Sequence, residues 1–179
     1  MKVKLPHTGM EVPHDRLRIE AYEEMLGHDG VAFRAQLYDA GRHLGVIENG
    51  GFGGPTSFWQ NTSGDRSAMV RFVEACRVDG EPLSAEEWVW DNLVDEYQTA
   101  VAVADLKPGE SLVRGLSEDR TWDGALCALA VPATLLARTD SPLSNAVVRT
   151  LREVSADTRS WEWWSGSSWM GLSLPGLSV

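Results

Sequence analysis

Three short stretches in the first third of the chain alternate apolar and polar residues, and segments rich in turn-forming residues separate them. The stretches span residues 16–21, 31–38 and 43–48. Alternation with a period of two places every second side chain on the same face, which is typical of a half-buried strand. The separating segments, 27–30 and 39–42, contain the Asp and Gly residues that tight turns favour. We therefore expect an antiparallel three-strand meander.

Helical patterns and a second hairpin are predicted after the meander. One helix is expected to open at residues 63–65, after a glycine-rich loop, and a longer helix is expected from the capping box at Ser84 to about Asp105. Residues 111–116 and 125–131 suggest a later hairpin, and a last helix is expected to begin at Ser141. This order of elements predicts an α+β fold, in which an antiparallel sheet packs against two to three helices.

The predicted domain organisation is a single domain with two appendages. The chain has 179 residues, a length that suits one compact domain. Residues 1–15 are expected to form a polar arm, residues 16–159 the single α+β domain, and residues 160–179 a Trp-rich C-terminal tail that packs on the domain or on a partner.

The expected location is the cytoplasm, or the host cytoplasm if the chain is phage-encoded. The two cysteines, Cys76 and Cys127, do not make a disulfide framework and read as buried apolar residues of a reducing compartment. The sequence contains no apolar stretch typical of a signal peptide or a membrane span. Arginine outnumbers lysine 13 to 3, which indicates a GC-rich genome, such as that of an actinobacterium or of a phage that grows in one.

Negative charge is concentrated in one segment, residues 79–105. The formal net charge of the chain is −10, and this segment contains eight acidic residues and no lysine or arginine. In helical projection Glu87, Asp91 and Asp95 lie one turn apart on one face, and Trp88 projects beside them, away from the apolar stripe. A tryptophan bordered by carboxylates is typical of a contact surface for a basic partner. The alternative is a solvated acidic face with Trp88 tucked under the preceding turn. The apolar stripe comprises Trp90, Leu93, Val94, Tyr97, Val101 and Ala104.

The charge also bears on which partners are expected. An acidic chain is poorly suited to direct nucleic-acid binding or to an anionic membrane surface, because both require basic residues. A basic protein, for example a nucleic-acid-handling enzyme, is the expected partner. Carboxylates on one helix make a poor metal site, since metal ligands usually come from several elements. We expect no metal, no cofactor and no catalytic residue.

A glycine-rich loop follows the third predicted strand, and it contains Asn49, Gly51, Phe52, Gly53 and Gly54. A phosphate-binding P-loop would need a lysine after the last glycine, and here a proline follows instead. The loop is interpreted as a bulged turn that needs positive φ angles, with Phe52 at its tip as a contact residue. The alternative is a phosphate or nucleotide site in a small enzyme, because glycine-rich turns can direct backbone amides at a phosphate.

The same loop carries a resemblance. A strand pair that leads into an Asn-x-Gly-x-Gly-Gly-like turn, here Asn49–Gly54, resembles a set of small uncharacterised proteins of phages and bacteria. The resemblance covers about residues 16–130. It implies a hairpin, a helical middle and a second hairpin, together with a phage or mobile-element origin, and it implies no activity and no functional residue.

The Trp-rich tail contains four tryptophans within nine residues. Burying a tryptophan stabilises a fold by about 2–3 kcal/mol, so four of them are expected to close over the sheet as part of the core. The alternative is a surface for a partner or for oligomerisation. The four residues are Trp161, Trp163, Trp164 and Trp169.

These observations favour a non-catalytic cytosolic interaction protein. It would be a modulator, an inhibitor or an immunity-like protein of a phage or mobile element, and it would bind a basic surface through the acidic helix. Two alternatives stay open. One is a small enzyme or a phosphate- or nucleotide-binding protein that uses the glycine loop. The other is a structural protein, for example of a virion, that forms homo-oligomers through the Trp-rich tail.

Overall fold

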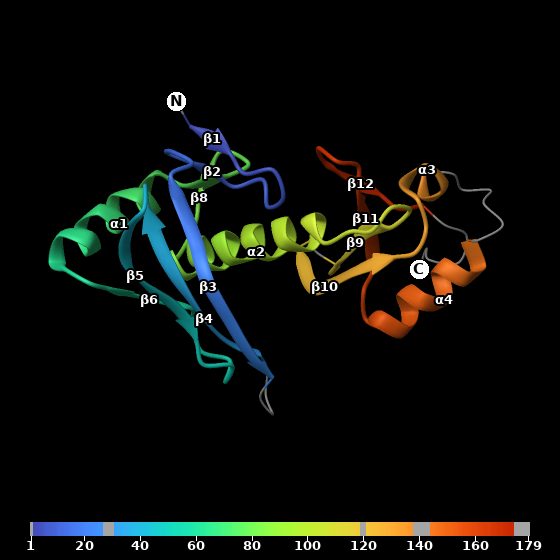
Figure 1. Ribbon diagram of the computed structural model, residues 1–179, viewed down its shortest axis with the longest axis horizontal. Coiled ribbons are helices and arrows are strands. Elements are labelled where there is room, and N and C mark those ends of the chain that lie inside the picture. The colour runs from blue at the N-terminus through green and yellow to red at the C-terminus, as the bar shows by residue number, and fades with distance from the viewer. Residues whose placement is uncertain (1, 27–30, 119–120, 138–143, 174–179) are drawn as a thin grey trace. The chain divides into compact units, whose positions relative to one another are not determined.

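The computed structural model describes residues 2–26, 31–118, 121–137 and 144–173 (Figure 1). Within these residues the chain forms antiparallel four-stranded sheets and four helices. The protein is therefore an α+β protein, and the predicted fold class is confirmed.

The chain divides into two compact units, Met1–Thr99 and Ala100–Val179. The boundary falls inside the long helix α2 (Glu86–Ala104). The segment 16–159, for which the sequence predicts a single domain, runs through both units. Each unit has its own cluster of buried apolar side chains.

The main sheet of the first unit is a meander in the order β3-β4-β5-β6. Its strands are β3 (Leu17–Leu26), β4 (Val31–Asp39), β5 (Arg42–Asn49) and β6 (Ser57–Gln60), and all neighbours pair antiparallel. The three predicted strands are confirmed. The fourth, β6, was not predicted, because four residues after a glycine loop give little periodic signal.

Strand β3 is longer than the alternation predicted. The register against β4 shifts between Glu20 and Glu23, and Ala21 has a φ of 48°. This irregularity is a β-bulge, which interrupts the period of two. The predicted strand therefore stops at residue 21, whereas β3 continues to Leu26.

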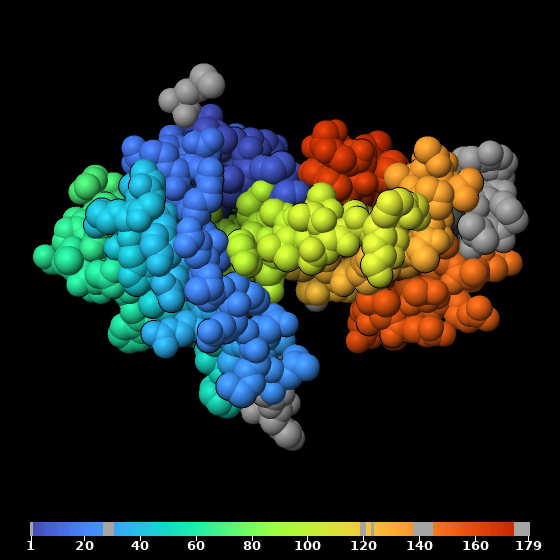
Figure 2. Space-filling model, in the orientation of Figure 1, coloured from blue at the N-terminus to red at the C-terminus, as the bar shows by residue number. Residues whose placement is uncertain are grey.

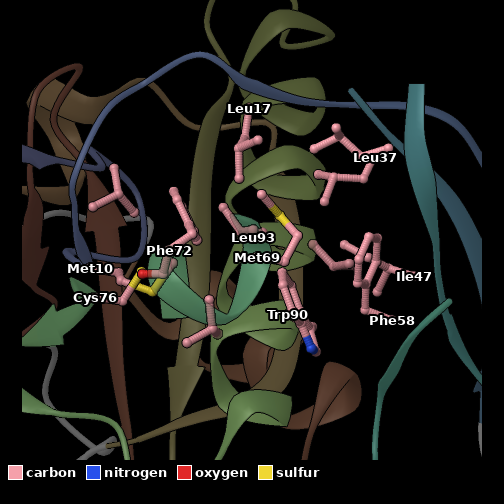
Figure 3. Packing of buried hydrophobic residues seen from close by; sticks show 14 residues of the cluster. Met10, Leu17, Leu37, Ile47, Phe58, Met69, Phe72, Cys76, Trp90 and Leu93 are labelled. Atoms are coloured by element: carbon pink, nitrogen blue, oxygen red, sulfur yellow. The ribbon is translucent and has the colours of Figure 1, made fainter. Parts of the chain in front are cut away.

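The core of the first unit lies between one face of this sheet and two helices, α1 (Ser63–Ala75) and α2 (Figure 3). Phe58 on β6 packs against Trp90 on α2, with ring centroids 5.2 Å apart. The next residue, Trp59, is exposed, because successive side chains of a strand point to opposite faces of a sheet. Helix α1 starts at the predicted place, and the side chain of Thr62 caps it by accepting a hydrogen bond from the backbone amide of Asp65.

The predicted apolar stripe of α2 holds only in the first half of the helix. Its first three residues, Trp90, Leu93 and Val94, are buried. Farther along, Val101 and Ala104 are exposed, which corrects the prediction. These two positions lie beyond the span of α2 whose residues belong to the buried cluster of the first unit.

Residues 2–15 belong to the expected polar arm, and they contribute two strands to a small four-stranded sheet. Strand β1 (Val3–Lys4) pairs with β2 (Glu11–Val12), and β2 in turn pairs with β7 (Arg77–Val78). The last strand of this sheet is β8 (Glu81–Pro82). Two-residue strands show no periodicity, and for that reason the sequence did not predict them. Met10 and Val12 belong to the core of the unit.

The second unit contains a sheet in the order β10-β9-β11-β12 and two helices. Its strands are β9 (Ser111–Leu116), β10 (Trp122–Leu129), β11 (Ser160–Trp164) and β12 (Trp169–Gly171), and its helices are α3 (Ala133–Leu136) and α4 (Ser144–Val154). The predicted hairpin and last helix are confirmed. The predicted helix start at Ser141 lies outside the described residues.

Candidate functional site

The glycine loop is a closed turn that the side chain of Asn49 holds together. Its Oδ1 accepts a hydrogen bond from the Gly51 amide at 2.8 Å, and its Nδ2 donates to the Gly54 carbonyl at 3.1 Å. Gly51 and Gly53 have φ angles of +73° and +74°, so the predicted need for positive φ is confirmed. Because the Gly51 amide already donates within the loop, it does not point at a phosphate.

The loop is packed directly against the start of strand β4. A Cβ atom on Gly51 would lie 2.7 Å from the backbone nitrogen of Ala32 and 3.0 Å from the carbonyl carbon of Val31. A Cβ atom essentially never approaches a backbone atom as closely as 2.7 Å, so a side chain at this position would force the backbone to shift. Glycine at this position therefore lets the loop rest on the β3–β4 hairpin. Figures 1 and 2 show the connection between β5 and β6, in teal, beside the lower part of this hairpin.

A chain of hydrogen bonds connects the loop to the acidic helix. Asn49 Nδ2 donates to Thr56 Oγ1 at 3.0 Å, and Thr56 Oγ1 donates to Asp91 Oδ1 at 2.5 Å. Thr56 is buried. The structure thus brings together two groups that the sequence identified separately, namely the glycine loop and Asp91 of the acidic face.

The environment of Asp91 alters its protonation. Burial raises the pKa of Asp91 above its usual range, the hydrogen bond from Thr56 opposes that effect, and the negative charge of Glu87 adds to it. Asp91 is consequently less available to a partner than a free surface carboxylate, since its Oδ1 already accepts the hydrogen bond from Thr56.

Other acids of the segment 79–105 also have partners within the first unit. Glu86 forms an ion pair with Arg66 of α1 at 3.0 Å. Glu96 accepts hydrogen bonds from the backbone amides of His7 and Thr8 at 3.0 and 2.9 Å, and from His7 Nδ1 at 2.7 Å. These partners come from distant parts of the chain. The absence of lysine and arginine in the segment therefore does not leave all of its carboxylates free.

Trp88 lies on α2 with 51% of its surface exposed, so its predicted projection away from the core is confirmed. Its backbone carbonyl accepts a hydrogen bond from Asn92 Nδ2 at 2.7 Å. Glu87 precedes it, Asp91 lies three residues farther along the helix and Asp95 seven, within two helical turns. Asp95 is half-buried. Burial raises the pKa of Tyr22 on β3, and the negative charges of Glu24 and Asp95 add to that shift.

The end of the β3–β4 hairpin carries a group of exposed apolar side chains that the sequence analysis largely missed. Met25, Leu26, Val31 and Phe52 have 71%, 82%, 43% and 81% of their surface exposed, and we refer to them as the apolar tip. Leu26 pairs with Val31 across the two strands, and Met25 pairs with Ala32. Of these four residues the sequence identified only Phe52. The signal available for the others was the pair of apolar residues, Met25 and Leu26, directly before the turn predicted at residues 27–30.

Within the Trp-rich tail, residues 160–171 form the β11–β12 hairpin of the second unit. Trp161 and Trp164 are buried, and Trp163 packs against the core from a half-buried position. Trp169 meets Trp164 edge to face at 5.3 Å, and the guanidinium of Arg114 lies 4.3 Å from its ring centre. Arg114 also pairs with Glu162 at 2.7 Å. These contacts make the tail part of this unit's fold and core, which was one of the two readings of the sequence.

The two cysteines belong neither to the loop nor to the acidic helix face, and neither forms a disulfide. Cys76 is buried and Cys127 half-buried, and both are free. Burial raises the pKa of the Cys76 thiol to about 12 and also raises the pKa of Cys127. Across the described residues no group of three or more His, Cys, Asp or Glu side chains could hold a metal ion. Within the same part of the chain, no helix is long and apolar enough to cross a membrane.

Comparisons with known proteins identified no relative of this chain. A scan against protein-family models found no match, and searches of curated proteins and of solved structures found none either. The resemblance to phage and bacterial proteins that the glycine turn suggests therefore stays a prediction.

Proposed function

We propose that this chain is a non-catalytic cytoplasmic binding protein that engages a basic protein surface through the first half of α2, with Trp88 as the anchor. The exposure of Trp88 beside carboxylates carries this proposal. A large apolar side chain in water is costly, and a partner that covers it gains both area and desolvation.

The charge around Trp88 supports a basic partner. The segment 79–105 contains eight acids and no base, and residues 1–99 together contain 17 acidic and nine basic residues. A surface of this sign accelerates encounter with a positively charged partner and disfavours an acidic one. Modulators or inhibitors of nucleic-acid-handling enzymes, including immunity-like proteins of phages or mobile elements, have this physical requirement.

The residues suited to a test follow from the contacts. Asp91 is unsuitable for charge reversal, because a lysine there would also remove the acceptor of Thr56. Glu87 is the better choice, since it lies next to Trp88 and is not part of that hydrogen-bond chain. Glu74 on α1 is exposed and provides a control with the same change in net charge. Trp59 on β6, which is 60% exposed, provides a control for the loss of an exposed tryptophan.

The experiment starts with capture from an actinobacterial lysate on the immobilised protein. The captured protein is identified by mass spectrometry, purified, and measured on a biosensor against each variant. Trp88→Ala is expected to raise the dissociation rate about tenfold or more, as for a hot-spot tryptophan. Glu87→Lys is expected to slow association several-fold at low salt, whereas Glu74→Lys and Trp59→Ala should have little effect.

Two outcomes would contradict the proposal. One is a purified partner whose surface is acidic. The other is a partner that binds Trp88→Ala and Glu87→Lys with the kinetics of the unaltered protein.

A further inference from the structure

The apolar tip exposes four large side chains at one end of the first unit. Met25, Leu26 and Phe52 each have more than two thirds of their surface in solvent. Scattered exposed apolar residues are normal on a protein, but a contiguous group of them marks a contact surface. Leu26 pairs with Val31, so these two side chains share one face of the hairpin, and the backbone of Gly51, next to Phe52, packs on Val31 and Ala32. Met25 precedes Leu26 on β3, so its side chain points to the opposite face and flanks the group.

The tip is held in place by the structure behind it. The loop that carries Phe52 is closed by Asn49 and is connected through Thr56 to α2. On the hairpin, the Tyr22 ring packs between Phe33 of β4 and Tyr97 of α2, at centroid distances of 5.9 and 5.8 Å. A surface held in this way loses little conformational entropy when a partner covers it.

The charges near the tip indicate which kind of partner can cover it. Residues 20–26, 31–36 and 48–52 contain four acids and one base, Arg34. The strand register places Arg34 between Glu23 and Glu48, so its charge is already balanced. An anionic membrane would be repelled by this border, and a second copy would bring the same sign of charge against it.

We propose that the apolar tip is a second contact surface for a basic protein, and that it inserts into an apolar pocket bordered by lysine and arginine. This inference rests on the proposed function for the charge of the partner. It adds to that function a second anchor, the apolar tip. It also states the chemistry of the pocket on the partner, which should be lined by aliphatic or aromatic side chains and bordered by positive charge.

A random peptide library displayed on phage tests the tip without a known partner. The library is selected in parallel on the unaltered protein, on Leu26→Ser/Phe52→Ser, on Trp88→Ala, and on Trp59→Ser as the control. The two tip residues are exposed, so their replacement leaves the buried cluster intact, and a thermal melt of each variant checks its fold.

The expected result is a class of peptides that depends on the tip. These peptides should combine aliphatic or aromatic residues with lysine or arginine, and they should bind Trp59→Ser normally. Leu26→Ser/Phe52→Ser should weaken their binding tenfold or more, and higher salt should weaken it further. Their retention on Trp88→Ala would show that the tip binds independently of α2.

Several results would overturn the inference. Peptides that bind the tip variant equally well, or tip-dependent peptides that are acidic or uncharged, would do so. Tip-dependent binding to phosphatidylcholine or phosphatidylglycerol vesicles would assign the tip to a membrane instead. A dimer in sedimentation equilibrium that Leu26→Ser/Phe52→Ser dissociates would assign it to a second copy. The two proposals can fail separately. If only the proposed function is wrong, Trp88→Ala and Glu87→Lys will not change partner binding, whereas Leu26→Ser/Phe52→Ser will still weaken the binding of the tip-dependent peptides.

Discussion

At the scale of single residues, Gly51 is the position where conformation and packing act together. Gly51 and Gly53 share nearly the same positive φ, but only a Cβ on Gly51 would collide with the backbone of β4. We expect Gly53→Ala to lower the free energy of unfolding by about 1 kcal/mol, the cost of a left-handed non-glycine residue. Gly51→Ala should cost about 1–3 kcal/mol more, as for overpacking. Urea denaturation measures both, and equal losses would show that the loop does not rest on β4.

Asp91 gives a prediction about pH. Its pKa is raised in the folded protein, mainly by burial, so the folded state binds the proton more tightly than the unfolded state does. The contribution of Asp91 to stability is therefore greatest below about pH 3.9, the ordinary pKa of aspartate, and is lost as the pH rises through the raised pKa.

The variant Asp91→Asn keeps an acceptor for Thr56 but cannot ionise. The difference in free energy of unfolding between this variant and the unaltered protein should shift in favour of the variant as the pH rises from about 4 to 7. Urea titrations at several pH values measure this difference, and Asp79→Asn, at an exposed position, serves as the control. A difference that does not change with pH would contradict the burial of a carboxylate at this position.

The sequence predicted residues whose properties are local and missed those whose partners are distant. The positive φ of Gly51 and the exposure of Trp88 follow from residue type and helical period, and both are confirmed. The partners of Asp91 and Glu96 lie 35 and 88 or more residues away in the chain. No helical projection can supply such partners, and for that reason the acidic face was predicted to be freer than it is.

At the scale of secondary-structure elements, Glu96 attaches the N-terminal segment to α2. It accepts hydrogen bonds from two backbone amides and from the side chains of His7 and Thr8. Glu96→Ala would leave those amides without their acceptor, and the free energy of unfolding should fall by about 2–3 kcal/mol. Hydrogen exchange should also rise in residues 2–12. Glu81→Ala on β8 removes an exposed carboxylate and serves as the control. It should change the free energy of unfolding by no more than about 0.5 kcal/mol and leave hydrogen exchange in residues 2–12 unchanged. Unchanged exchange in residues 2–12 of Glu96→Ala would contradict the attachment.

Elements were predictable where they are long and periodic. Strands β4 and β5, the β9–β10 hairpin and α2 all show several periods, and the sequence located them. The bulge in β3 interrupted the alternation after Ala21, so the end of the strand was missed together with most of the apolar tip. A β-bulge requires a partner strand for its definition, and hence one strand read alone does not reveal it.

At the scale of the whole molecule, the sequence offered no linker at which to divide the chain. The boundary between the two units falls inside α2, where helical periodicity continues without a break. The two buried clusters are separate, one drawn from residues 10–94 and the other from residues 113–172. Periodicity indicates that a residue is buried, but it does not indicate in which cluster, and this is why one domain was the natural prediction.

Separate clusters predict separate responses to a cavity. Leu37 lies fully buried in the first cluster and Leu151 in the second, so replacement of either by alanine should destabilise its surroundings by about 2–5 kcal/mol. We expect Leu37→Ala to raise hydrogen exchange mainly within residues 2–99, and Leu151→Ala mainly within residues 100–173, because each cavity weakens the cluster that contains it. Mass spectrometry of the exchanged peptides measures this directly. Equal loss of protection across both ranges in both variants would instead show that residues 16–159 unfold as the single domain that the sequence predicted.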